Sequence, residues 1–198
     1  NNYLLGITAD IMRFKEDEEL LLDKILDAAE QKGTGGWSTN AALELGVAFD
    51  TITASVMARN MSAKKEERKM AESLYKSRET GGGVKSSDAQ ELFISYRAAS
   101  IINHAIGFDL LLKASKTYEW ELNLSEIARI WTNGCIIRSG FMEDLIDLFK
   151  ASPSANILLT REIATELSEM KPFFLDTLVA IIRTGCPMQL LSAAANYF

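Results

Sequence analysis

The stretch DAQELFISYRAASIINHAIGFDLLLKASKTY, residues 88–118, decides the fold. No proline interrupts it and only Gly107 weakens it, so it predicts one helix of about 45 Å at ~1.5 Å per residue. A helix wetted on one side would keep a polar face, whereas this one is apolar nearly all round. We therefore predict that it is enclosed by other helices and forms the spine of the domain. Its apolar residues are Leu92, Ile94, Tyr96, Ile101, Ile102, Ile106, Leu110 and Leu111.

Helical periodicity continues through almost all of the remaining chain, and no stretch alternates convincingly with period two. Repeats and internal domain boundaries are not evident. We predict an all-α, multi-helix fold that forms a single domain over residues 1–198 around the long helix. A glycine-rich break is expected at residues 33–36 and a flexible loop at 81–83. The other predicted helices cover 4–14, 20–29, a segment capped by Ser38 or Thr39 and ending near Gly46, 49–60, 63–77, 125–132, 137–150, 160–171, 172–184, and a last one opened by Pro187.

Composition restricts the class of protein. The chain has 198 residues, of which 47% are hydrophobic, enough to bury one sizeable core. The net charge of −6, with acidic and basic residues interleaved, disfavours nucleic acid as a partner. No run reaches the roughly 20 apolar residues of a membrane span, so we expect no membrane partner. Cys135 and Cys186 are flanked by apolar residues and are predicted to be buried thiols in a reducing, cytoplasmic setting.

The ends of the sequence suggest a piece of a longer protein. The chain begins with Asn1-Asn2 rather than Met, directly before a helical pattern. We expect an excised fragment.

A first candidate site is the segment Gln31-Lys32-Gly33-Thr34-Gly35-Gly36-Trp37. Glycines let a ligand approach the backbone, and a lysine, a threonine hydroxyl and free amide groups can all donate to a phosphate. The segment follows a helix, so it is neither a Walker loop nor a dinucleotide fingerprint. Two interpretations remain open: an anion site, or a glycine-rich turn between helices with a solvated lysine.

A second candidate is Arg59, which follows the mostly apolar run from Ile52 to Met57. A guanidinium there can form two parallel hydrogen bonds to a phosphate or carboxylate. A cation near a helix C-terminus is also favoured for structural reasons alone. Both interpretations remain open.

Two further features favour structural roles. The segment from Ile130 to Ser139, with Gly134 and Arg138, is typical of a packing corner with one paired charge. His104 is the only histidine and lies in the middle of the long helix, where a hydrogen-bonded core residue is the simpler interpretation. With one histidine and two distant cysteines, no metal-ligand set is visible.

Together, in this order, the segments resemble 6-phosphogluconate dehydrogenase over residues 3–198. The resemblance rests on several motifs at matching separations: Gln31-Lys32-Gly33-Thr34-Gly35 with Trp37; Ala58-Arg59, Ser62, Lys64 and Glu67-Arg68; Ile130-Trp131 with Gly134-Cys135-Ile136-Ile137-Arg138-Ser139; Asn156-Ile157-Leu158-Leu159; and Ser192-Ala193-Ala194 with Tyr197.

The resemblance implies a function. The family converts 6-phosphogluconate and NADP to ribulose 5-phosphate, carbon dioxide and NADPH in the pentose phosphate pathway, as a homodimer. By resemblance, Lys32, Arg59 and Thr34 contact the substrate, largely at its phosphate. The family's general acid and base and its Rossmann cofactor domain would precede Asn1, and its C-terminal tail would follow Phe198. No catalytic, cofactor-binding or metal residue is therefore expected within these 198 residues, and the isolated piece should be inactive.

The sequence departs from the family at three places. Glu30 stands where a glycine is usual, Gly36 where a lysine is common, and Thr132-Asn133 where Arg-Gly is usual. Glu30 places a negative charge near the proposed phosphate site. An alternative function is therefore a non-catalytic helical dimerisation module of a diverged relative.

Overall fold

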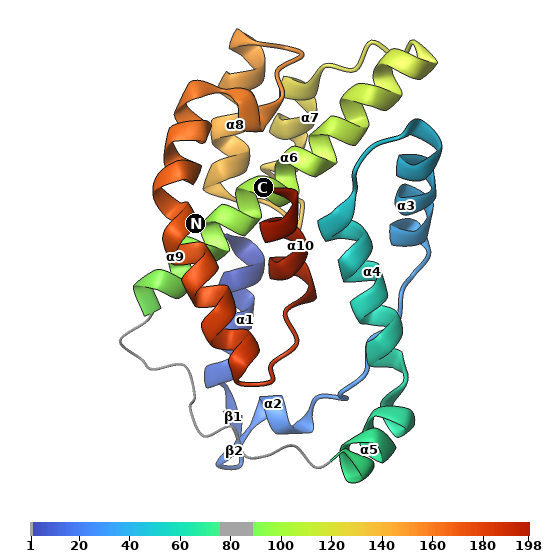
Figure 1. Ribbon diagram of the computed structural model, residues 1–198, viewed down its shortest axis with the longest axis vertical. Helices are drawn as coiled ribbons and strands as arrows, with labels where there is room; N and C mark the ends of the chain where they lie inside the picture. Colours follow the sequence, from blue (N-terminus) through green and yellow to red (C-terminus); the bar gives the residue numbers. More distant parts are fainter. Residues whose placement is uncertain (1, 76–88) are drawn as a thin grey trace. The chain divides into compact units, whose positions relative to one another are not determined.

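A computed structural model describes residues 2–75 and 89–198 (Figure 1). The predicted loop at 81–83 lies outside these residues. The chain folds into two compact units, one formed by Asn1–Asp27 and Tyr118–Ala155, the other by Ala28–Thr117 and Asn156–Phe198. That they make up a single domain stays a prediction. The predicted all-α class is confirmed, apart from one two-stranded hairpin.

The first unit begins with α1 (Tyr3–Arg13), capped by the Asn2 side chain. Strands β1 (Lys15–Glu16) and β2 (Glu19–Leu20) then form an antiparallel hairpin. The prediction of a helix over 20–29 was wrong, because the hairpin takes up Leu20 and α2 covers only Leu21–Lys24. The chain leaves α2 at Ile25 in extended conformation.

Helices α7 (Leu124–Trp131) and α8 (Gly140–Ala151) pack side by side in the same unit (Figure 1). Asn123 and Ser139 cap them, since each side chain accepts a hydrogen bond from an amide in the first turn. The Ser125 hydroxyl donates to the carbonyl of Ile146 at 2.9 Å and ties the two helices together. The residues that these helices bury are Leu124, Ser125, Ala128, Phe141, Met142, Leu145 and Phe149.

The second unit holds the spine. It is α6 (Ala89–Tyr118), whose residues up to Thr117 belong to this unit. Its middle is buried, with Ile101, Ile102 and Ile106 at 0% exposure, so the predicted spine is confirmed there. Nearer its start, Phe93 is 59% exposed.

The spine is tied to two other helices of the unit, α4 (Asp50–Ala63) and α9 (Arg161–Arg183). The hydroxyl of Thr51 on α4 donates to the Asn103 side chain at 2.7 Å. Arg97 pairs with Glu166 of α9 at 2.8 Å. Polar contacts at half-buried positions thus fix how α4 and α9 meet the spine.

Helix α9 corrects a second prediction, because Arg161–Arg183 is one continuous helix with Pro172 inside it, whereas two helices over 160–171 and 172–184 were predicted. Proline costs the helix one hydrogen bond. The buried residues before and after it lie on one face, and packing along that face holds the helix together. They are Ile163, Leu167, Phe174, Leu178 and Ile181.

The remaining elements of the second unit are α3 (Thr34–Leu45), α5 (Lys65–Leu74), the short 3-10 turn η2 (Ile157–Leu159) and α10 (Gln189–Tyr197). Helix α4 packs against α3 on one side and against α10 on another. Gly46 and Gly185 follow α3 and α9 with positive φ, and the predicted end of a helix near Gly46 is confirmed. Within residues 2–75 and 89–198, no helix is long and apolar enough to cross a membrane.

Candidate anion site at the start of α3

The glycine-rich segment at residues 33–36 is the beginning of a helix, whereas a break between helices was predicted there. Gly33 has φ +100°, a conformation that L side chains rarely adopt, and it turns the chain into α3 at Thr34. The amide of Trp37 donates to the Gly33 carbonyl at 3.0 Å and closes the first turn. The predicted cap at Ser38 or Thr39 was therefore wrong.

This early start changes the chemistry of the segment. Gly33 brings no side chain to the cap, so the amides of the first turn, those of Thr34, Gly35 and Gly36, receive no hydrogen bond from the cap residue. Amides at a helix N-terminus, together with the positive end of the helix dipole, favour an anion. The hydroxyls of Ser38 and Thr39 are used inside the helix, where they donate to carbonyls of its first turn.

Gly35 permits close packing between α3 and α4. A Cβ atom at this position would lie 2.7 Å from Cγ2 of Val56, closer than such atoms approach in proteins. Val56 is buried and β-branched, so it has little freedom to move aside. The glycine thus sets the distance between the start of α3 and the helix that carries Arg59.

Arg59 reaches across to the segment that precedes α3. Its Nε and Nη2 groups both donate to the carbonyl oxygen of Glu30, at 3.1 and 2.6 Å. Both N–H groups thus meet a single backbone carbonyl oxygen in this structure, and the predicted fork to a phosphate or carboxylate stays a prediction. The predicted end of this helix at residue 60 was wrong, because α4 runs on to Ala63.

The structure brings the three predicted site residues into one region. Arg59 bonds to Glu30, which is two residues before Lys32, and Thr34 is the first residue of α3. The side chains of Lys32, Thr34 and Arg59 are all exposed. Glu30 meets Arg59 through its backbone carbonyl, and Glu30, which is exposed, adds a negative charge to this segment. The region offers a lysine, an arginine, a hydroxyl and helix amides to a small anion.

A second hydrogen bond holds the same segment, one residue before the carbonyl that Arg59 contacts. The amide of Ala29 donates to the hydroxyl of Ser62 at 3.0 Å, and Arg68 donates through Nη2 to the carbonyl of Ser62 at 3.1 Å. Sequence reasoning assigned no role to either residue. Helical periodicity carries no signal for a contact between segments thirty residues apart, so only the fold could show it.

His104 faces inward on the spine, as the structural interpretation predicts. Its Nδ1 lies 2.7 Å from the carbonyl of Ser100. A carbonyl can only accept, so Nδ1 carries the proton. Burial lowers the pKa of His104, and the hydrogen bond to Ser100 opposes that shift.

Because His104 is the only histidine, it gives stability a distinct pH dependence. Its pKa is lower in the folded state than the value of about 6.5 in the unfolded state, so the unfolded chain takes up the proton first. Stability should be complete above pH 6.5 and fall as the pH drops from there toward the folded-state pKa. His104→Leu should remove this fall. Urea melts of the parent protein and of His104→Leu between pH 7.5 and 5.5 give the free energy of unfolding at each pH. An equal fall of this free energy with pH in both proteins would contradict the prediction.

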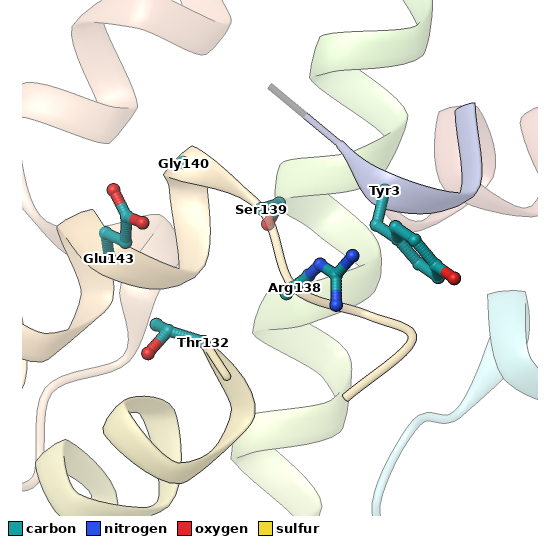
Figure 2. A pocket seen from close by; sticks show the side chains of 6 residues that line it. All are labelled: Tyr3, Thr132, Arg138, Ser139, Gly140 and Glu143. Carbon is teal, nitrogen blue, oxygen red and sulfur yellow. The ribbon is translucent and has the colours of Figure 1, made fainter. Parts of the chain in front are cut away.

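The segment from Ile130 to Ser139 contributes Thr132, Arg138 and Ser139 to the lining of a pocket of about 280 Å³ in the first unit (Figure 2). The Arg138 guanidinium stacks on the ring of Tyr3, 3.7 Å from its centre, and the Arg138 carbonyl accepts from the Tyr3 amide. The arginine is thus engaged by the aromatic ring of Tyr3 on α1, whereas the structural interpretation expected a paired charge. The apolar flanks are not core, because Ile130 and Ile136 are 58% and 62% exposed.

The prediction that both cysteines are buried was wrong. Cys135 is half-buried, whereas Cys186 is exposed beyond the end of α9.

Tyr197, in the closing motif, has its pKa raised by burial first and then by the nearby carboxylates of Asp109 and Asp50.

Comparison with known proteins agrees with the geometry. The family model of the 6-phosphogluconate dehydrogenase C-terminal domain matches residues 1–198. The decarboxylating 6-phosphogluconate dehydrogenases of Synechococcus elongatus and Treponema pallidum are 39% and 38% identical, over 100% of this chain and 43% and 42% of their own lengths. The chain thus spans less than half the length of these relatives.

A solved structure of Plasmodium falciparum 6-phosphogluconate dehydrogenase, studied apo, with its cofactor NADP+ and with its substrate 6-phosphogluconate, is also similar. It aligns with a TM-score of 0.94 at 33% identity, covering 100% of this chain and 44% of that one. The family match extends over every residue, and the fold agrees closely with that of a solved member. The chain therefore belongs to the 6-phosphogluconate dehydrogenase family and corresponds to its C-terminal domain.

Proposed function

We propose that this chain is the substrate-binding and dimerisation domain of a cytoplasmic, NADP-dependent, decarboxylating 6-phosphogluconate dehydrogenase of the pentose phosphate pathway. The observation that carries the proposal is the pair of hydrogen bonds from Arg59 to the Glu30 carbonyl, which ties α4 to the segment that contains Lys32 and leads into α3. Relatives named for this activity match the whole chain, and the Plasmodium protein binds NADP+ and 6-phosphogluconate.

The proposed role of the site is to hold the phosphate end of the substrate. Lys32 and Arg59 balance the charge of the phosphate, while Thr34 and the α3 amides donate hydrogen bonds to its oxygens. NADP+, when bound, would accept the hydride from C3 of the sugar acid while the C3 hydroxyl gives up its proton, and the resulting β-keto acid would then lose carbon dioxide. A fixed phosphate restricts where C3 can lie, which lowers the entropy cost of the reaction.

A homodimer is supported by an exposed apolar stripe on α9. Leu175, Val179 and Ile182 follow one another at helical spacing and are 40%, 48% and 50% exposed. Apolar side chains aligned on one face are typical of a surface that another protein covers.

The proposal is tested by assaying the full-length protein with 6-phosphogluconate and NADP+. We expect NADPH and carbon dioxide in equal amounts, and no NADPH from the 198 residues alone, since the proposed acid and base lie outside them. A full-length protein that dimerises but ignores 6-phosphogluconate would contradict the proposal and favour a non-catalytic dimerisation module.

A further inference from the structure

Ser62 occupies an unusual position for a helical serine. It lies in the last turn of α4, and its hydroxyl accepts a hydrogen bond from the amide of Ala29 at 3.0 Å. Serines inside helices usually donate to a carbonyl of their own helix, as Ser55 does to Ile52 in the same α4. Ser62 instead holds the chain three residues before Lys32.

Arg68 supports Ser62 from the next helix. Helices α4 and α5 are separated only by Lys64. The last carbonyls of a helix lack partners within it, and Arg68 donates through Nη2 to the carbonyl of Ser62 at 3.1 Å. This bond fixes the end of α4 relative to the first turns of α5.

We propose that Ser62 and Arg68 are positioning residues for the Lys32 segment, an inference that rests on the proposed function. Arg59 holds the carbonyl of Glu30 and Ser62 holds the amide of Ala29, so the chain is fixed on both sides of one peptide unit. Fixing this unit aims Lys32 at the phosphate. Ser62 bonds to the segment itself and Arg68 bonds to Ser62, so both residues act on the substrate through the position of Lys32.

The test measures steady-state kinetics of the full-length enzyme. Ser62→Ala should raise KM for 6-phosphogluconate roughly threefold to tenfold, the effect of one lost hydrogen bond, with kcat within about twofold of the starting value. The inhibition constant of inorganic phosphate should rise by the same factor, while KM for NADP+ should not change. Ser62→Thr keeps a hydroxyl and should restore KM.

A double-mutant cycle separates positioning from general damage. If Ser62 acts through Lys32, adding Ser62→Ala to Lys32→Ala should raise KM no further. Ser73→Ala is the matched control, because it removes a hydroxyl that bonds only within the exposed α5. Arg68→Met, which keeps the apolar stem and removes the donors, should give the same pattern and decides the matter if Ser62→Ala does not fold.

The outcomes distinguish the two proposals. If Lys32→Ala raises KM but Ser62→Ala and Arg68→Met leave it unchanged, or add fully to Lys32→Ala, the positioning role is wrong and the proposed function stands. If Lys32→Ala itself leaves KM unchanged, the proposed function fails.

Discussion

Replacing Arg59 by alanine in the full-length enzyme should raise KM for 6-phosphogluconate by about two orders of magnitude. Arg59 would supply a charge to the phosphate, and it also forms both bonds to the Glu30 carbonyl that hold the Lys32 segment. Hydrogen bonds to charged groups contribute about 1.5–3 kcal/mol each, and about 2.7 kcal/mol corresponds to a hundredfold change. Initial rates over a range of 6-phosphogluconate concentrations give the KM.

Two variants control this prediction. Arg59→Lys keeps the charge but not the planar fork, so it should recover only part of the affinity. Lys69→Ala removes an exposed cation of α5 that pairs with Glu66, and it should leave KM unchanged. A KM for Arg59→Ala within twofold of the starting value would show that Arg59 does not hold the substrate.

Ile102→Asp should unfold the second unit or bring it close to unfolding. Ile102 is 0% exposed in the middle of α6. An isolated carboxylate there has to be desolvated or protonated, at a cost of about 4 kcal/mol or more, a large part of the stability of an ordinary domain. Thermal unfolding followed by circular dichroism measures the loss.

Lys113→Asp is the matched control for the spine. It places the same carboxylate on the same helix at an exposed position, so it should change stability by about 0.5 kcal/mol or less. If both variants melted at the same temperature as the parent protein, α6 would not be the buried spine of this fold.

The long helix could be predicted because its signal is local and strong. An apolar run of this length without proline is too long for one strand and favours a buried helix, and the structure places α6 at Ala89–Tyr118. The break predicted at Pro172 failed for the opposite reason. Proline weakens a helix locally, whereas the burial of Leu167 and Phe174 along one face is a tertiary effect that single-sequence patterns do not contain.

The residues of the candidate site could be proposed from the sequence, whereas the contacts that hold the Lys32 segment could not. Lys32, Thr34 and Arg59 stand out by type, by the neighbouring glycines and by resemblance. That Arg59 holds the carbonyl of Glu30, and that Gly35 lies against Val56, depends on how α3 and α4 pack. Contacts between distant segments leave no periodic trace in one sequence, so the anchoring of the segment came only from the structure.

The most direct test is a crystal structure of the full-length enzyme with 6-phosphogluconate. We expect the phosphate oxygens within about 3 Å of Lys32 Nζ and of the Arg59 guanidinium, with the first-turn amides of α3 pointing at the same group. A bound sugar acid whose phosphate contacts neither Lys32 nor Arg59 would contradict the assignment of this site.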